Sequence, residues 1–230
     1  LDEGDVEPAW ERDYNVIIGD GQWTRPETGW LVYTDGSLLN GNSGAGGTIQ
    51  DDEGTDLVSI SELLPSNTSV YQAELAAVYR ACMILINWDL AGHEFTFFVD
   101  NQASLRSLTS PYNRQQSVKE VASKLNSLAA NNIVTLKWIE AHVGFAGNEY
   151  ADRMAKLACD SIRRDNQRKI FPSKRYVMGQ ISKQTIEIWN NRWIRSKDDF
   201  ARRFKYFYSG TDKAKSATLL AHPRSTVGRT

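Results

Sequence analysis

Two hydrophobic runs, each ending in an aspartate, constrain the fold of this chain most. Trp30 to Asp35 combines apolar, β-branched and aromatic residues, as strands do, and Gly36-Ser37 follows at once. Phe95 to Asp100 is an almost unbroken apolar run, which is typical of a strand covered on both faces. We therefore predict two strands, each with a carboxylate where the strand ends.

A long helical pattern lies between these runs. From Tyr71 to Trp88 apolar residues recur at helical spacing, and no Gly or Pro interrupts them. At 100° per residue, Glu74 falls within about 40° of Val78 and Leu85, so its carboxylate should point with the apolar face towards the sheet. A charge in that position needs a partner.

A third region runs from His142 to Asp152. Its glycines permit a tight loop, and we expect Asn148 to cap the helix that follows. Asp152 would then lie in the first turns of that helix, where negative charge is favoured and a carboxylate is ready to accept a metal ion. We expect His142 to remain on the loop, free to move.

In their order these motifs resemble those of ribonuclease H domains: Tyr-Thr-Asp35-Gly-Ser, Ala73-Glu74-Leu, Asp100-Asn-Gln, and His142-x-Gly-x-x-Gly-Asn-Glu-x-Ala-Asp152. The resemblance covers roughly residues 28 to 163 and is greatest to the version carried by non-LTR retrotransposon polyproteins. It implies endonucleolytic cleavage of the RNA strand of an RNA–DNA hybrid. A reverse transcriptase domain in the same polyprotein is then an expected partner, and this chain would be a piece of that longer protein.

The residue types fit hydrolysis of a phosphodiester by two divalent ions. Mg²⁺ prefers carboxylate oxygens, and Mn²⁺ could substitute for it. We hypothesise that Asp35 bridges both ions, that Asp100 and Glu74 complete one site, and that Asp152 completes the other. His142 would act late, in proton transfer or product release, because histidine exchanges protons near neutral pH.

Selectivity for the hybrid would come from the wide minor groove and the 2′-hydroxyls of RNA. By position in the motifs, the predicted contacts are Gly36, Ser37, Gln102 and Asn148. Asn40 is a further candidate, although the spacing fits the nearby Asn42 equally well.

Each residue alone has a simpler interpretation. Asp35 before Gly36 could be a turn residue, Asp100-Asn101 a helix cap, and Glu74 a surface position. His142 could be an ordinary loop histidine. The joint occurrence of all five in one order favours catalysis. The alternatives are a catalytically silent domain that binds hybrid or tethers a partner, and another nuclease of the same fold, such as a DEDD exonuclease or a DDE transposase.

Charge divides the chain. Residues 1–160 hold 10 Lys/Arg and 23 Asp/Glu, whereas residues 161–230 hold 17 and 5. The whole-chain net charge of −1 therefore conceals an acidic N-terminal part and a basic C-terminal part. We predict an acidic N-terminal linker (1–27), a catalytic domain (28–163) and a basic, aromatic-rich C-terminal extension (164–230).

The extension interleaves aromatic with basic residues, a composition that suits phosphate contact and base stacking. The residues are Trp189, Trp193, Phe200, Phe204, Tyr206, Phe207 and Tyr208 among Arg192, Arg195, Arg202, Arg203 and Lys205. Ile181, Thr185 and Ile188 follow a helical spacing, which also fits docking on the catalytic domain. Both interpretations stay open. Cellular members of the family that the chain resembles commonly carry a basic, tryptophan-bearing handle that grips the hybrid, between the positions of Asp100 and His142. This stretch offers only Arg106, Arg114, Lys119, Lys124 and Lys137, so the resemblance implies that the catalytic domain alone binds hybrid weakly.

The predicted fold is α/β and ribonuclease H-like: a five-stranded mixed sheet, with an antiparallel meander and parallel strands, flanked by helices. We expect its glycine-rich second strand, Ser43 to Gln50, to let nucleic acid approach.

The sequence shows neither a membrane span nor a signal peptide. Cys82 and Cys159 fall on predicted helices as small apolar positions, which suggests a reducing compartment. We therefore expect an intracellular protein, nuclear or cytoplasmic or both, that is not secreted.

Overall fold

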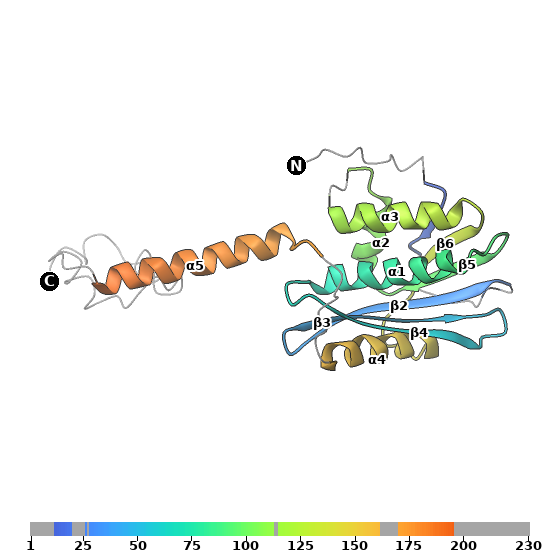
Figure 1. Cartoon of the computed structure of the whole chain (residues 1–230), viewed down its shortest axis with the longest axis horizontal. Coiled ribbons are helices and arrows are strands. Elements are labelled where there is room, and N and C mark those ends of the chain that lie inside the picture. The colour runs from blue at the N-terminus through green and yellow to red at the C-terminus, as the bar shows by residue number, and fades with distance from the viewer. Residues whose placement is uncertain (1–11, 20–25, 27, 113–114, 162–169, 196–230) are drawn as a thin grey trace. The chain divides into compact units, whose positions relative to one another are not determined.

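The chain forms two compact units, Leu1–Pro172 and Ser173–Thr230. The computed structural model describes residues 12–19, 26, 28–112, 115–161 and 170–195. The first unit holds a sheet with helices on both of its faces, and what is described of the second is the long helix α5 (Lys174–Arg195) (Figure 1).

The sheet is mixed, as predicted, and its strand order is β1-β6-β5-β2-β3-β4. The first four strands in that order are parallel, and β2, β3 and β4 form an antiparallel meander. The strands are β1 (Asn15–Ile17), β2 (Trp30–Leu39), β3 (Asn42–Gln50), β4 (Asp56–Leu64), β5 (Glu94–Val99) and β6 (Ile133–Trp138). The α/β prediction is confirmed, with one strand more than the five expected.

The additional strand, β1, comes from the segment predicted to be a linker. Asn15 aligns with Thr135 of β6 in a parallel pair. Just before it, the buried Tyr14 donates its hydroxyl hydrogen to the carbonyl of Leu108 over 3.1 Å. Three residues are too few for strand periodicity to show in the sequence, so this part of the domain could not be predicted from pattern alone.

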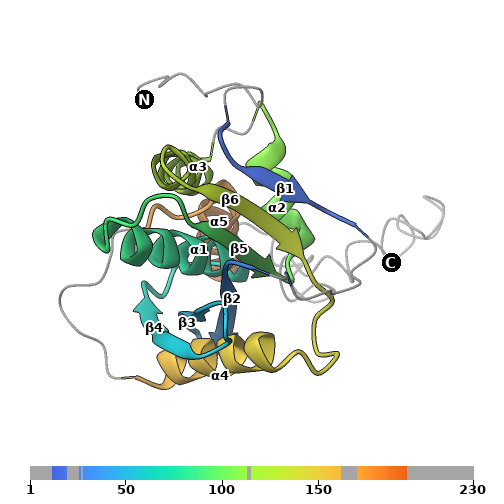
Figure 2. The same cartoon turned by 90° about the vertical axis from the view of Figure 1, so that its right-hand side faces the viewer.

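Helices cover both faces of the sheet, with α1 and α3 on one face and α4 on the other (Figures 1 and 2). The helices of this unit are α1 (Val70–Asn87), α2 (Gln102–Thr109), α3 (Gln116–Ala129) and α4 (Ala146–Asp160). The predicted helix around Glu74 is therefore confirmed. It begins with a capping box, in which Ser69 and Gln72 satisfy each other's backbone N–H groups.

Asp35 does not end its strand, contrary to the prediction. Strand β2 continues through Gly36 to Leu39, because β3 pairs with it along its whole length, as far as Leu39 opposite Asn42. What ends beside Asp35 is the parallel partner, since the last pair between β2 and β5 is Thr34 with Val99. Asp100 follows β5 directly, so the two aspartates still lie at the same edge of the parallel part of the sheet.

The glycines of β3 serve helix packing rather than access of nucleic acid. A Cβ added to Gly46 would lie 2.1 Å from the amide nitrogen of Ala155, and one on Gly44 would lie 2.3 Å from the Ala155 carbonyl oxygen. Helix α4 thus rests directly on the backbone of β3, and it brings Asp152 to the same face of the sheet as Asp35. The expectation that this strand admits nucleic acid is wrong for these positions.

Helix α5 makes up most of the described part of the C-terminal extension. Ile181, Thr185, Ile188 and Trp189 are all exposed on it. Whether this stripe docks on the catalytic domain stays a prediction, and the aromatic residues from Phe200 onward lie outside the described residues. No helix in the described part of the chain is long and apolar enough to cross a membrane.

Candidate active site

Three of the four predicted carboxylates converge at one point. One oxygen from each of Asp35 on β2, Glu74 on α1 and Asp100 after β5 lies within 4.8 Å of the other two. Asp35 and Glu74 are 8% and 3% exposed. Glu74 reaches the sheet because α1 packs closely on β2: a Cβ on Gly36 would lie 2.3 Å from the Glu74 amide nitrogen.

This three-carboxylate group is electrostatically strained. Burial, followed by the negative charges of Asp100 and Asp152, raises the pKa of Asp35 to about 7. Burial and then the charges of Asp35 and Asp100 raise the pKa of Glu74 well above its ordinary value. The pKa of Asp100 is also raised, chiefly by burial. Negative charge crowded in this way favours protonation, or a bound cation.

The fourth carboxylate, Asp152, lies on the second turn of α4 and belongs to a separate group. Ligand atoms of His142, Glu149 and Asp152 lie within 4.8 Å of one another. Asp152 accepts a hydrogen bond from the Lys156 ammonium over 2.6 Å. Its charge nevertheless raises the pKa values of Asp35 and Asp100, so the two groups share one field.

His142 lies on the loop before α4, as predicted. Its backbone has a φ of +58°, a left-handed conformation that is uncommon for residues other than glycine. The imidazole is 70% exposed, with Nδ1 4.0 Å from a carboxylate oxygen of Glu149. Strained backbone that carries an exposed, chemically able side chain is typical of functional loops.

Asn148 has a different role from the predicted helix cap. Helix α4 begins at Ala146, so Asn148 lies inside its first turn, and the residue in the capping position, Phe145, makes no side-chain cap. The Asn148 side chain is buried and donates from Nδ2 to Oδ2 of Asp100 over 3.2 Å. This hydrogen bond lowers the pKa of Asp100 and so partly offsets its burial.

The structure places the other predicted nucleic-acid contacts around this edge. Ser37 lies two residues beyond Asp35 on β2, and Asn40 is exposed at the β2–β3 turn with a φ of +52°. Gln102 begins α2 and accepts a hydrogen bond from Arg106 over 3.1 Å. Asn42 is less available, because its amide donates to the carbonyl of Cys159.

Three further residues of the site were not predicted. Trp138 donates from its indole Nε1 to the Asp100 carbonyl over 2.9 Å, across 38 residues of sequence. Lys156 and Glu149 flank Asp152. Lys156 could have been found four residues after Asp152, at the helical spacing for an ion pair, whereas the Trp138 contact has no local signal.

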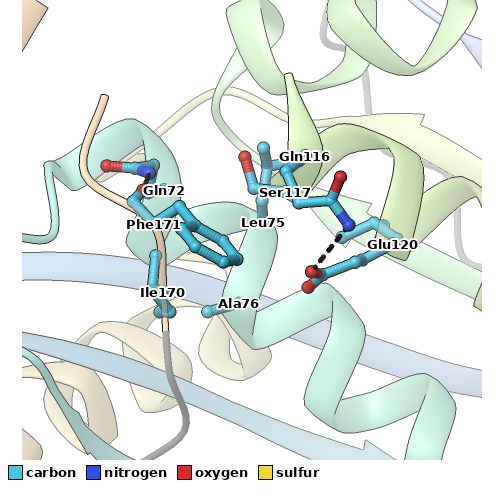
Figure 3. A pocket seen from close by; sticks show the side chains of 9 residues that line it. Gln72, Leu75, Ala76, Gln116, Ser117, Glu120, Ile170 and Phe171 are labelled. Atoms are coloured by element: carbon cyan, nitrogen blue, oxygen red, sulfur yellow. Dashed lines mark hydrogen bonds between the residues drawn. The ribbon is translucent and has the colours of Figure 1, made fainter. Parts of the chain in front are cut away.

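A shallow hollow opens on the α1–α3 side, and none of the five predicted catalytic residues lines it. Figure 3 shows Phe171 and Ile170 lying against α1, with Gln116 and Glu120 of α3 opposite. The buried Gln72 donates from Nε2 to the Phe171 carbonyl over 2.8 Å. Phe171 is therefore held against α1 by a hydrogen bond.

The donor set fits Mg²⁺. The group offers carboxylate oxygens only, the ligands that this hard cation prefers. One of them, Oε2 of Glu74, is buried, and none of the residues that the structure describes donates a hydrogen bond to it. A buried carboxylate oxygen without a donor is costly in free energy, and a cation would satisfy it.

Residues 27–160 match the family model described as RNase H. The chain belongs to the RNase H family. The match nearly coincides with the predicted catalytic domain and contains all five predicted catalytic residues. The family makes this protein a ribonuclease H-type hydrolase.

Curated relatives agree with this assignment. The chain is 29% identical over 149 residues to "Ribonuclease H" of Neorickettsia sennetsu, covering 58% of this chain and 94% of that protein. It is 26% identical over 144 residues to "Ribonuclease H" of Ruthia magnifica, covering 57% and 96%. Both alignments span nearly all of the relative, so the similarity covers a whole ribonuclease H.

Among solved structures, a foamy viral protease-reverse transcriptase in complex with RNA/DNA hybrid shares the fold. Its TM-score is 0.50 at 20% identity, and the match covers 63% of this chain and 22% of that one. At this identity the likeness supports the fold alone.

Proposed function

We propose that this protein hydrolyses the RNA strand of RNA–DNA hybrids endonucleolytically. The observation that carries the proposal is the convergence of Asp35, Glu74 and Asp100 within 4.8 Å, in a chain of the RNase H family. Three buried or half-buried carboxylates whose oxygens lie within 4.8 Å of one another are unfavourable when ionised unless a cation joins them.

We propose two Mg²⁺ ions as cofactors. Asp35, Glu74 and Asp100 would hold one ion, and Asp35 with Asp152 would hold the other. When bound, such ions make water nucleophilic and stabilise negative charge on a phosphodiester. Asp35 is the natural shared ligand, since its carboxylate is affected by the charges of both Asp100 and Asp152.

The chain's own residues set the geometry of this site. Asn148 and Trp138 hold Asp100 from its side chain and from its carbonyl, so the carboxylate cannot turn away when its charge is repelled. Glu74 is held in place because the part of α1 that carries it is buried. His142 is exposed and is the residue we propose for proton transfer or product release, late in the reaction.

Recognition of the RNA strand would use the partly exposed rim of the site. Ser37, Asn40 and Gln102 are proposed to meet 2′-hydroxyls and the sugar–phosphate backbone. We propose that Gly36 contributes its backbone near the strand. The buried Asn148 side chain already binds Asp100, so its main effect would be on the carboxylate and not on direct contact with substrate.

We also propose that this domain works in a retrotransposon polyprotein, beside a reverse transcriptase. The proposal rests on the motifs and on the basic composition of residues 161–230, which would add phosphate contacts that the acidic domain lacks. Deleting residues 173–230, the second unit, should lower the salt dependence of hybrid affinity if that unit touches phosphates.

Cleavage of a labelled RNA–DNA hybrid in Mg²⁺ tests the function. We expect only the RNA strand to be cut, and nothing to be cut in EDTA. Tight binding without cutting would favour a silent, hybrid-binding domain instead.

A further inference from the structure

An ion pair occupies Asp152, the carboxylate that stands apart from the other three. The ammonium of Lys156 lies 2.6 Å from Oδ2 of Asp152, one helical turn along α4. Its side chain is 51% exposed, whereas that of Asp152 is 15% exposed. The ammonium therefore reaches in from solvent to a largely covered carboxylate.

The charge of Lys156 acts on more than its immediate partner. The hydrogen bond to Asp152 raises the pKa of Lys156, and the charges of Asp35 and Glu149 raise it further. In return, Lys156 lowers the pKa of Asp35. The ammonium thus lies in the shared negative field of the site, where a cation is most favoured.

The three-carboxylate group differs in this respect. In the described part of the chain, no lysine or arginine forms an ion pair with Asp35, Glu74 or Asp100. A cation can bind there without displacing an ammonium or guanidinium group of the described residues. At Asp152 it must first displace an ammonium.

We propose that Lys156 is a built-in competitor for cations at Asp152: its ammonium holds the carboxylate when no metal is bound there and releases it when a divalent cation binds. The inference rests on the proposed function only in taking Asp152 as a metal ligand. Competition by Lys156 would make the cation at Asp152 the more weakly bound of the two. It would also set the metal concentration at which both positions are filled. Lys156 acts here through Asp152 and is a positioning residue.

Binding of Mn²⁺ to the full chain, measured by the electron paramagnetic resonance of the free ion, tests this without any need for cleavage. We expect K156Q to tighten the weaker binding step about two- to fivefold, the range that an exposed ion pair supports, and to change the stronger step less. The matched control is R153Q, which removes one positive charge from the same helix. Arg153 lies over the ring of Tyr150, 5.3 Å from its centre, and forms no ion pair with a carboxylate of the described residues. A weaker step that K156Q leaves unchanged, or that R153Q tightens equally, would overturn the proposal.

A double variant separates competition at Asp152 from a general effect of charge. D152N should remove the weaker step, and adding K156Q should then change Mn²⁺ binding no more than adding R153Q does. Tighter binding by D152N/K156Q than by D152N/R153Q would contradict the proposal. If the wild-type protein shows a single Mn²⁺ binding step, K156Q should show a second one. A single step in K156Q as well would also contradict the proposal.

The outcomes for the proposed function remain distinct. Loss of hybrid cleavage with the K156Q effect intact would count against the nuclease function alone. Cleavage with no K156Q effect would count against the competitor alone. Failure of wild type to bind Mn²⁺ at all would overturn both. K156R, which keeps the charge, should keep the weaker step close to that of wild type.

Discussion

The indole of Trp138 donates a hydrogen bond to the main-chain carbonyl of Asp100, 2.9 Å away. This bond ties the end of β6 to the point where the chain leaves β5, and it fixes the backbone that carries a site carboxylate. Together with the Asn148 amide, it holds Asp100 from two sides. Asp100 is therefore fixed in position before any cation binds.

Trp138→Phe should weaken the site with little effect on the fold. It removes one donor and keeps an aromatic ring, so the free energy of unfolding should fall by about 1 kcal/mol. The Mg²⁺ concentration for half-maximal cleavage should rise several-fold, because Asp100 is less well held. Chemical denaturation and a Mg²⁺ titration of cleavage measure the two effects. Trp88→Phe is the control, since Trp88 packs on Trp30 away from Asp100; an equal change in its Mg²⁺ requirement would contradict the role of Trp138.

Asp35→Asn and Asp100→Asn should each abolish cleavage, by about a thousandfold or more, because the metal ligands act as a unit. Hybrid affinity in Ca²⁺ or EDTA should change little, since contacts on the rim of the site remain. Gel-shift and cleavage assays on the same preparations separate binding from chemistry. Asp160→Asn, at the exposed end of α4, is the matched control and should cleave normally. Cleavage retained by either site variant would remove that residue from the mechanism.

The stability of the metal-free protein should fall as pH rises. The pKa of Asp35 is raised to about 7 in the folded state, so this carboxyl binds its proton more tightly folded than unfolded. Its contribution to stability is complete below the unfolded-state pKa of about 4 and is lost as pH rises through about 7. The raised pKa values of Glu74 and Asp100 act in the same direction.

Thermal melting from about pH 5 to about pH 8 in EDTA measures this loss, which should lower Tm by several degrees. Mg²⁺ should restore Tm at the upper pH far more than at the lower, because protons compete with the ion for the carboxylates. Asp35→Asn should flatten the pH dependence. A wild-type Tm that rises over this interval would show that the carboxylates are not crowded as described.

Gly46→Ala should destabilise the fold strongly. The new Cβ would lie 2.1 Å from the Ala155 nitrogen and 2.3 Å from the Ala151 carbonyl oxygen, so α4 must move off the sheet. We expect a loss of about 3 kcal/mol or more, the upper end for overpacking against backbone that cannot yield. Gly19→Ala is the control, because a Cβ there meets nothing within 4 Å. Urea unfolding compares the two; similar stabilities would mean that α4 does not pack on β3 as described.

Gln72→Ala should loosen the chain that leaves the catalytic unit. Gln72 completes the cap of α1 and also holds the Phe171 carbonyl, so its loss should lower the free energy of unfolding by about 1–2 kcal/mol. The matched control is Gln116, which lies on the other side of the same hollow (Figure 3). Its side-chain amide donates a hydrogen bond to Glu120. Gln116→Ala should change stability by less than about 0.5 kcal/mol. Limited proteolysis at Phe171 should accelerate only in Gln72→Ala.

The sequence predicted those parts of the site that have local signals. Apolar periodicity placed Glu74 on the sheet-facing side of α1, and the abrupt end of an apolar run placed Asp100 after β5. Loop glycines correctly kept His142 outside a helix. Each of these features depends on a few neighbouring residues, which is why a pattern could reveal it.

The features that were missed depend on residues far apart in the chain. Asp35 lies within β2 because β3, paired through a hairpin at Asn40, extends the strand past Gly36. Strand β1 depends on β6, over a hundred residues later. Asn148 binds Asp100 because α4 begins three residues earlier than a cap at Asn148 would require. Tertiary pairing overrode the local preference of glycine for turns and of asparagine for caps.

Cleavage of a hybrid whose RNA strand is labelled, with duplex DNA and duplex RNA as controls, tests the central claim most directly. We predict cutting of the hybrid's RNA strand alone, in Mg²⁺ and not in EDTA, and its loss in Asp35→Asn. Cutting of duplex DNA, cutting that persists in EDTA, or activity in Asp35→Asn equal to wild type would contradict the claim that these carboxylates form a metal-dependent ribonuclease H site.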